Sequence, residues 1–230
     1  MGEFSKYEIY VDAWSLYYYK DVPVLRNKMH IKDEKLLKMA EEEITFKKAY
    51  ELTHQPITGR FGITHLFRIH KFMFGDIYSF AGRIRYENIS KGQTKFYPVQ
   101  SIDRELKTLF NKLKAGNFLV GLDEEMFFEK LTYYMAELNI IHPFREGNGR
   151  TIREFIRELA LKNGYAIHWD KVSKQELLDA SIASVFEPEH LQYQHPVLLR
   201  LNLLQFLLFL QFFLRYINYG VFLNNTRYHW

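Results

Sequence analysis

Nine consecutive residues, 142 to 150, bring together side chains that suit chemistry at phosphorus. His142 is of the type that acts as a general base near neutral pH. Glu146 offers a hard carboxylate oxygen of the kind that Mg²⁺ binds, and Mg²⁺ in turn prefers phosphate partners. Arg150 can form charge-assisted hydrogen bonds with phosphate oxygens. Together these types fit an in-line displacement at phosphorus, where catalysis depends mainly on positioning and charge neutralisation.

The surrounding pattern predicts that this stretch is a loop between two helices. Pro143 disfavours helical backbone for the residue before it, so the preceding helix should end at His142. A second helix is expected to begin near Arg150 and to stop at Asn163-Gly164. The glycines that precede it let a ligand approach the unpaired N–H groups of its first turn closely. The sequence therefore predicts an anion site at the start of this helix.

Each of these residues also has an ordinary interpretation. A histidine before a proline is usually a cap, a lone arginine at a helix start is usually solvated, and Gly-Asn-Gly is usually a turn. Their occurrence together within nine residues favours the catalytic interpretation. There is no Walker lysine pattern, no complete dinucleotide fingerprint and no second histidine of a helical zinc site. His70 is expected to be a core histidine, and Arg157 to pair with Glu154 or Glu158 on the surface.

Most of the chain up to about residue 187 reads as helix. Helices are predicted from Asp33 towards Leu52 and onward from residues 62, 99, 123 and 173. Residues 83 to 99 differ, because β-forming residues flank a turn at 91–93 and the segment stops at Pro98. The expected fold class is therefore all-α with a small β-hairpin.

The composition changes after about residue 190. Residues 198–214 are mostly Leu and Phe, but polar residues interrupt the run, so it falls short of the roughly 18 uninterrupted apolar residues of a membrane span. A membrane is therefore not an expected partner. The run is interpreted as a buried or oligomerising helix, with a membrane-surface segment and a tail not native to the domain as alternatives.

Composition sets further bounds. A chain of 230 residues suits one substantial domain, or one domain with an appendage. The net charge of +4 is not concentrated in a basic run, so direct nucleic-acid binding is not expected. The absence of cysteine excludes disulfides and thiolate metal sites and fits a reducing cytosol. The N-terminus lacks a secretory signal pattern, so a cytoplasmic protein is expected.

The string HPFREGNGR at residues 142–150 resembles the complete motif of the Fic family, HPFx[D/E]GNGR. YSFAGRIR at residues 78–85 resembles the family segment that leads into its flap hairpin, and residues 134–139 and 151–155 extend the similarity. The resemblance covers roughly residues 10 to 187. It implies a mainly helical Fic domain over residues 1–187, with the motif loop at 142–150 and the flap at about 83–99. Residues 188–230 would then be a hydrophobic C-terminal extension.

The resemblance implies that the protein attaches AMP from ATP to a hydroxyl side chain of a target protein. His142 would deprotonate that hydroxyl, which attacks the α-phosphorus. Glu146 would hold Mg²⁺ between the α- and β-phosphates. Phe144 would anchor the loop in the core.

Further residues match the nucleotide-binding positions of the family. Gly147, Asn148 and Gly149 would line the anion hole, with Asn148 bonding the α-phosphate. Arg150 would neutralise the β-phosphate of the leaving pyrophosphate, and Arg153 would reach the γ-phosphate.

The hairpin also has a counterpart in the family. Thr94, Lys95 and Phe96 resemble the flap that docks the target as an added strand. An ordinary edge strand is the alternative for Lys95 and Phe96.

Fic enzymes are commonly inhibited by a helix with the pattern [S/T]xxxE[G/N], whose glutamate pairs with the arginine at the position of Arg153. This sequence lacks the pattern; Ser101 and Glu105 have the spacing, but Leu106 follows. The chain therefore resembles the toxin of a bacterial toxin–antitoxin pair, whose small antitoxin chain supplies the helix. Such toxins act on type II topoisomerases, namely DNA gyrase and topoisomerase IV. The alternative is a self-inhibited Fic protein whose C-terminus has been altered.

Two other functions stay open. A relative of the same fold could use UMP, phosphocholine or phosphoryl donors, although the intact GNGR argues against the phosphorylating variant, whose motif resembles ANKR. A catalytically silent interaction module would predict a decayed motif, and the motif is intact.

Overall fold

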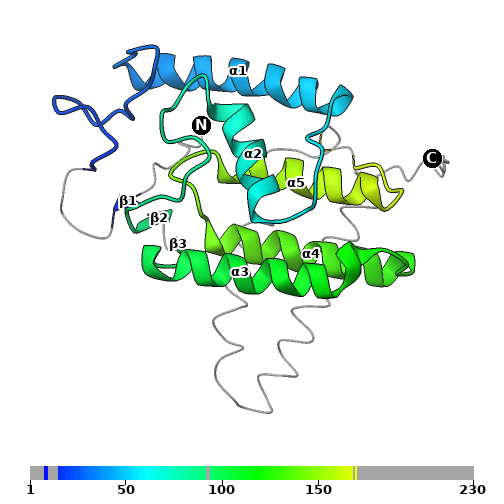
Figure 1. The fold of residues 1–230 in the computed structure, drawn as a ribbon. Coiled ribbons are helices and arrows are strands. Elements are labelled where there is room, and N and C mark those ends of the chain that lie inside the picture. The colour runs from blue at the N-terminus through cyan, green and yellow to red at the C-terminus, as the bar shows by residue number, and fades with distance from the viewer. Residues whose placement is uncertain (1–7, 10–14, 92–93, 168, 170–230) are drawn as a thin grey trace. The chain divides into compact units, whose positions relative to one another are not determined.

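The computed structural model describes residues 8–9, 15–91, 94–167 and 169. Within these residues the fold is mainly helical with a small antiparallel sheet, which confirms the predicted class (Figure 1). The helices are α1 (Glu34–His54), α2 (Ile63–Phe74), α3 (Val99–Ala115), α4 (Glu124–Ile141) and α5 (Asn148–Lys162), with a 3₁₀ turn η1 (Asn117–Leu119). The strands are β1 (Glu8–Ile9), β2 (Ile89–Lys91) and β3 (Thr94–Lys95). The helix predicted from Ser173 and the hydrophobic run at 198–214 lie outside the described residues.

Two compact units share the chain. The first comprises Met1–Lys114 and Ile141–Phe155, and the second comprises Ala115–Ile140 and Ile156–Trp230. The first unit contains the motif loop, the hairpin and the beginning of α5, so the candidate site can be described within it.

Capping and burial explain the helices of the first unit. Asp33 caps α1 as predicted, because its Oδ1 accepts a hydrogen bond from the backbone N–H of Leu36 at 2.7 Å. Helix α1 packs against α2. The apolar face of α2 is completely or almost completely buried and forms the core of this unit: Leu66, Ile69, Met73 and Phe74.

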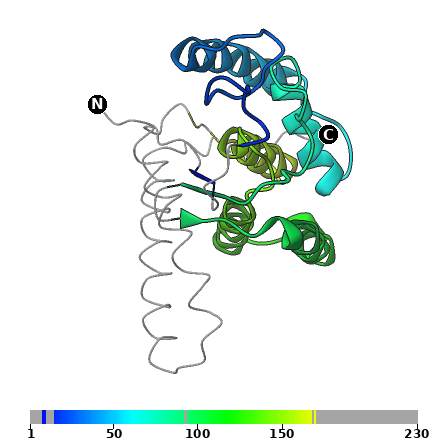
Figure 2. The ribbon, with the colours of Figure 1, turned by 90° about the vertical axis from the view of Figure 1, so that its left-hand side faces the viewer.

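The predicted hairpin is present. Strands β2 and β3 lie side by side (Figure 2) and pair antiparallel. Ser90 lies opposite Lys95, and Lys91 lies opposite Thr94. Its turn residues 92–93 lie outside the described residues. Strand β1 pairs with the other edge of β2 and was not predicted, since two residues are too few to show an alternating pattern.

Helix α4 begins after Asp123, whose Oδ1 accepts a hydrogen bond from the N–H of Met126 at 2.9 Å. At the end of α5, Asn163 donates to the carbonyl oxygen of Phe118 at 3.1 Å, and the ring of Tyr165 stacks on that of Phe127 with centroids 4.5 Å apart. In the part of the chain that the structure describes, no helix combines the length and apolarity needed to cross a membrane.

Candidate active site

The motif loop runs from the end of α4 to the start of α5. Helix α4 ends at Ile141, as Pro143 predicted, and α5 begins at Asn148, two residues before the expected start. Two loop residues have left-handed backbone, His142 with φ +47° and Gly147 with φ +81°. A left-handed backbone is uncommon outside glycine, so the conformation of His142 depends on what surrounds it.

Gly147 is required for two reasons. Its positive φ disfavours any residue with a Cβ. A Cβ at this position would also lie 2.2 Å from Cζ of Phe74, which is fully buried. The ring of Phe74 therefore packs directly against the backbone of Gly147.

Asn148 closes the loop on itself. Its Nδ2 donates to the carbonyl oxygen of Phe144 at 2.7 Å, and its Oδ1 accepts from the N–H of Phe144 at 2.9 Å. The side chain is completely buried. Oδ1 and one hydrogen of Nδ2 are therefore used within the loop, and Phe144 fixes the orientation of the Asn148 amide.

Phe144 anchors the loop in the core, as expected. It is completely buried and stacks on the ring of His70 with centroids 3.8 Å apart. The ring of Phe67 contacts the ring of Phe144 edge-on, with centroids 5.1 Å apart.

His70 is a buried core histidine, as predicted, and it also supports the loop. The N–H of Gly82 donates to its Nδ1 at 2.7 Å, so Nε2 carries the proton and donates to the carbonyl oxygen of Glu146 at 2.9 Å. Burial, together with the nearby Arg150, lowers the pKa of His70 to about 4, while its bond to Glu146 opposes the shift. The ring is therefore neutral near pH 7.

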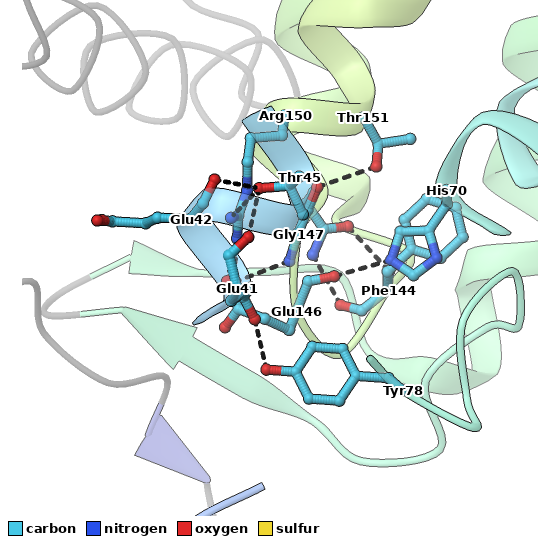
Figure 3. Close-up of polar contacts among 11 residues, drawn as sticks. Glu41, Glu42, Thr45, His70, Tyr78, Phe144, Glu146, Gly147, Arg150 and Thr151 are labelled. Carbon is cyan, nitrogen blue, oxygen red and sulfur yellow. Dashed lines mark hydrogen bonds and ion pairs between the residues drawn. The ribbon is translucent and has the colours of Figure 1, made fainter. Parts of the chain in front are cut away.

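Arg150 is held by residues far away in the sequence (Figure 3). Its Nη1 donates to Oγ1 of Thr45 at 3.0 Å, and its Nη2 forms a hydrogen-bonded ion pair with Glu41. The same nitrogen lies 3.6 Å from Oε1 of Glu146. Its guanidinium carbon lies 4.8 Å from the centre of the Phe74 ring.

Tyr78 completes this network by donating its hydroxyl hydrogen to the other carboxylate oxygen of Glu41 (Figure 3). Sequence reasoning missed the roles of Glu41, Thr45 and Tyr78 in this network, because nothing in the local spacing links α1, or the segment after α2, to Arg150.

The charges of this cluster influence one another. Burial raises the pKa of Glu146 and the negative charge of Glu41 adds to the effect, while Arg150 and the N–H of Gly147 oppose it. Burial alone would lower the pKa of Arg150, but the carboxylates of Glu41 and Glu146 raise it overall. Burial and repulsion from Arg150 lower the pKa of Arg153 to about 10, so its guanidinium stays charged near pH 7.

Arg153 reaches the same end of α5. A Cβ built on Gly149 would lie 3.2 Å from its Nη1, so the guanidinium lies beside the first turn of the helix. The structure therefore places two positive side chains, Arg150 and Arg153, near the N-terminus of α5, where the helix dipole is also positive.

The hairpin lies against the candidate base. The ring of Phe96, which directly follows β3, stacks on the imidazole of His142 with centroids 3.6 Å apart and an interplanar angle of 16°. Both side chains are buried. Thr94 is also buried, whereas Lys95 is exposed.

Arg85 joins the hairpin to the motif loop and was not predicted. Its guanidinium is completely buried and donates to three backbone carbonyls: His142 at 2.8 Å, Glu87 at 2.7 Å, and Tyr97. The backbone N–H of Arg85 donates to the carbonyl oxygen of Pro143 at 2.9 Å. Since Glu87 and Tyr97 precede and follow the hairpin, Arg85 ties both of its limbs to the candidate base.

One expectation is wrong. Glu154 and Glu158 are only 6% and 4% exposed, so any pairing of Arg157 with them does not take place on the surface. Helix α5 is buried on more than one face, which a single apolar stripe did not reveal.

The chain is similar to known proteins in sequence and in fold. Residues 60–160 match the model of the Fic/DOC family. The protein adenylyltransferase VbhT of Bartonella schoenbuchensis is 40% identical over 183 residues, which are 80% of this chain but 38% of the relative. A probable protein adenylyltransferase Fic of Salmonella typhimurium is 36% identical over 157 residues, which are 68% of this chain and 78% of the relative.

A solved structure is also similar. The BepC protein of Bartonella tribocorum, a VirB-translocated effector with bound AMPPNP, has a TM-score of 0.68 and 28% identity, covering 74% of this chain and 88% of that chain. Motif, fold and relatives agree, and the chain belongs to the Fic/DOC family.

Proposed function

We propose that the protein is an adenylyltransferase that moves AMP from ATP to a hydroxyl side chain of another protein. The observation that carries the proposal is the motif loop at residues 142–150, which runs into the N-terminus of α5 and in which Nη2 of Arg150 lies 3.6 Å from Oε1 of Glu146. The relatives named above as adenylyltransferases support it, as does the AMPPNP bound by BepC.

Each motif residue has a task in this reaction. His142 accepts the proton of the target hydroxyl as the hydroxyl oxygen bonds to the α-phosphorus. The bond between the α-phosphorus and the bridging oxygen breaks, and pyrophosphate leaves. Arg150 and Arg153 offset the negative charge of the leaving group. The N–H groups of Asn148 and Gly149, the first two of α5, bind the α-phosphate, next to the turn at Gly147, whose own N–H donates to Oε1 of Glu146 at 2.8 Å.

Glu146 fits a magnesium ion that comes with the nucleotide. Within the described ranges, no three His, Cys, Asp or Glu side chains form a metal cluster, and Mg²⁺ commonly binds one or two carboxylates plus substrate phosphates. The side chain of Glu146 is 26% exposed and lies beside Arg150. When bound, Mg²⁺ would neutralise phosphate charge.

The hairpin is proposed to receive the target. Strand β3 is at one end of the sheet order β1-β2-β3, so an extended segment can add to its edge. Thr94, Lys95 and Phe96 would then hold the modified residue next to His142, on which Phe96 stacks.

The sequence also supports a bacterial, cytoplasmic toxin that acts on a type II topoisomerase such as DNA gyrase or topoisomerase IV. Its support is the resemblance of this sequence, which contains no [S/T]xxxE[G/N] pattern, to the Fic toxins that a small antitoxin chain inhibits. Co-purification of such a chain tests this step.

The test of AMP transfer compares ATP labelled at the α-phosphate with ATP labelled at the γ-phosphate, in bacterial lysate with Mg²⁺. We expect α-label alone to enter a protein band, and His142→Ala to abolish the labelling. His54→Ala, which changes an exposed histidine of α1, is the matched control. Transfer of γ-label would instead identify a phosphoryl transferase, and label from UTP or CDP-choline would identify another donor.

A further inference from the structure

Glu41 is a buried carboxylate that lies outside both the motif and the matched residues 60–160. Both of its oxygens are engaged, one by Arg150 and the other by the hydroxyl of Tyr78 (Figure 3). It is 8% exposed. Burying a carboxylate costs free energy unless the group is paired and hydrogen-bonded, so the folded state depends on these two contacts of Glu41.

Helix α1 holds Arg150 at two points, one helical turn apart. A carboxylate oxygen of Glu41 accepts a hydrogen bond from Nη2 of Arg150, and Oγ1 of Thr45 accepts one from Nη1 at 3.0 Å. Thr45 donates its own hydrogen to the carbonyl oxygen of Glu41 at 2.7 Å, which leaves its lone pairs to accept from Arg150. With the ring of Phe74 below it, the guanidinium is held by three side chains.

Two carboxylates compete for this arginine. Glu41 forms the hydrogen-bonded pair, while Glu146 lies 3.6 Å from the same nitrogen. If Glu41 were neutral, Glu146 would be the nearest charged partner left for Arg150 among the residues that the structure describes. Arg150 would then close on the carboxylate that is needed for the metal, and both groups would be lost to the nucleotide.

We propose that Glu41 is a positioning residue that directs Arg150 towards the pyrophosphate end of the nucleotide and keeps it away from Glu146. This rests on the function proposed above only in taking ATP as the ligand. It predicts that Glu41 sets the preference of the site for a nucleoside triphosphate over a monophosphate, since AMP has no β-phosphate for Arg150 to meet.

The experiment is calorimetric binding of a non-hydrolysable ATP analogue and of AMP, in buffer with Mg²⁺. We expect Glu41→Gln to weaken binding of the analogue at least about tenfold, because Arg150 would pair with Glu146 and would have to leave it before meeting the β-phosphate. The affinity for AMP should not change. Glu42→Gln is the control: it removes the same charge one residue away, and the Glu42 side chain is exposed and extends away from Arg150 (Figure 3).

A double-mutant cycle separates positioning from general damage. If Glu41 acts through Arg150, Glu41→Gln should have no further effect on analogue binding in an Arg150→Ala background. Thermal unfolding and circular dichroism verify that the variants are folded. If Glu41→Gln does not fold, Thr45→Val removes the second α1 contact and should weaken analogue binding selectively in the same way.

Three results would overturn the proposal. They are an equal loss of affinity for the analogue and AMP, a gain of affinity for the analogue, and an effect of Glu41→Gln that persists without Arg150. The proposed AMP transfer fails separately. A wild-type protein that binds the analogue tightly but transfers no α-label would contradict the enzyme assignment while leaving the role of Glu41 intact.

Discussion

Nε of Arg85 donates to the carbonyl oxygen of His142 at 2.8 Å, so a buried cation holds the backbone of the candidate base. His142 has a positive φ, and Pro143 restricts the same peptide. The other guanidinium nitrogens bind the two limbs of the hairpin at Glu87 and Tyr97. The conformation of the base and the attachment of the flap therefore depend on one side chain.

Arg85→Lys should slow AMP transfer without loss of ATP binding. An ammonium group cannot reproduce a planar fork that bonds three separate carbonyls, and a misplaced base costs on the order of 10²-fold in rate. Transfer would be measured at saturating ATP and nucleotide binding by calorimetry. Arg83→Lys is a control on an exposed side chain of the same segment. Unchanged transfer by a folded Arg85→Lys protein would contradict the role assigned to Arg85.

Gly147→Ala should destabilise the fold more than Gly121→Ala. Both glycines have positive φ, but a Cβ at position 147 would overlap the ring of Phe74, whereas nothing lies within 4 Å of one at position 121. Backbone strain alone costs about 1 kcal/mol, and overpacking adds roughly 1–3 kcal/mol. Urea unfolding of the two variants measures the difference. Equal losses would show that Phe74 moves aside freely.

His70 should make stability fall with acid. Its pKa is lowered from 6.5 to about 4, so the folded state binds fewer protons than the unfolded state between these values. The contribution of His70 to the free energy of unfolding is therefore complete above pH 6.5. It decreases by about 3 kcal/mol in total as the pH falls towards 4.

His70→Gln removes this titrating ring. Unfolding free energies measured between pH 4 and 6.5 should show a slope that is smaller than that of the wild type by up to about 1.4 kcal/mol per pH unit. Identical slopes for the wild type and His70→Gln would show that the ring is protonated in the folded protein.

Phe96→Ala should disturb His142 directly. A ring stacked at 3.6 Å shields the imidazole protons, so their NMR resonances should move downfield when the ring is removed. Transfer to the target should fall about tenfold, since a stacked aromatic pair with its buried area is worth roughly 1–2 kcal/mol. Phe96→Tyr keeps the stack and should preserve both the resonances and the rate. If the resonances of Phe96→Ala match the wild type, the stack does not exist in solution.

Local chemistry made much of the fold predictable from sequence. Asp33, Asp123 and Pro143 specify helix ends through their own backbone and nearest neighbours, and α1, α4 and the motif loop begin or end where these residues indicate. The hairpin followed from β-forming residues around a turn.

The supports of the site were not predictable in this way. Glu41, Arg85 and His70 act on groups that are distant in the sequence, and their neighbours along the chain do not distinguish them from ordinary helix or core residues. The amide of Asn148 shows the same limit: its partner is nearby, but the direction of its side chain depends on a loop conformation that spacing does not encode.

The contact between Glu41 and Arg150 joins residues 109 positions apart. Closing so long a loop has a large entropic cost and is slow compared with the formation of either helix. During folding, α1 and α5 can each form early, but the anion site is complete only when both ends have come together. The ability to bind a triphosphate should therefore be among the last properties to appear as the chain folds, after its helical signal has reached the native level.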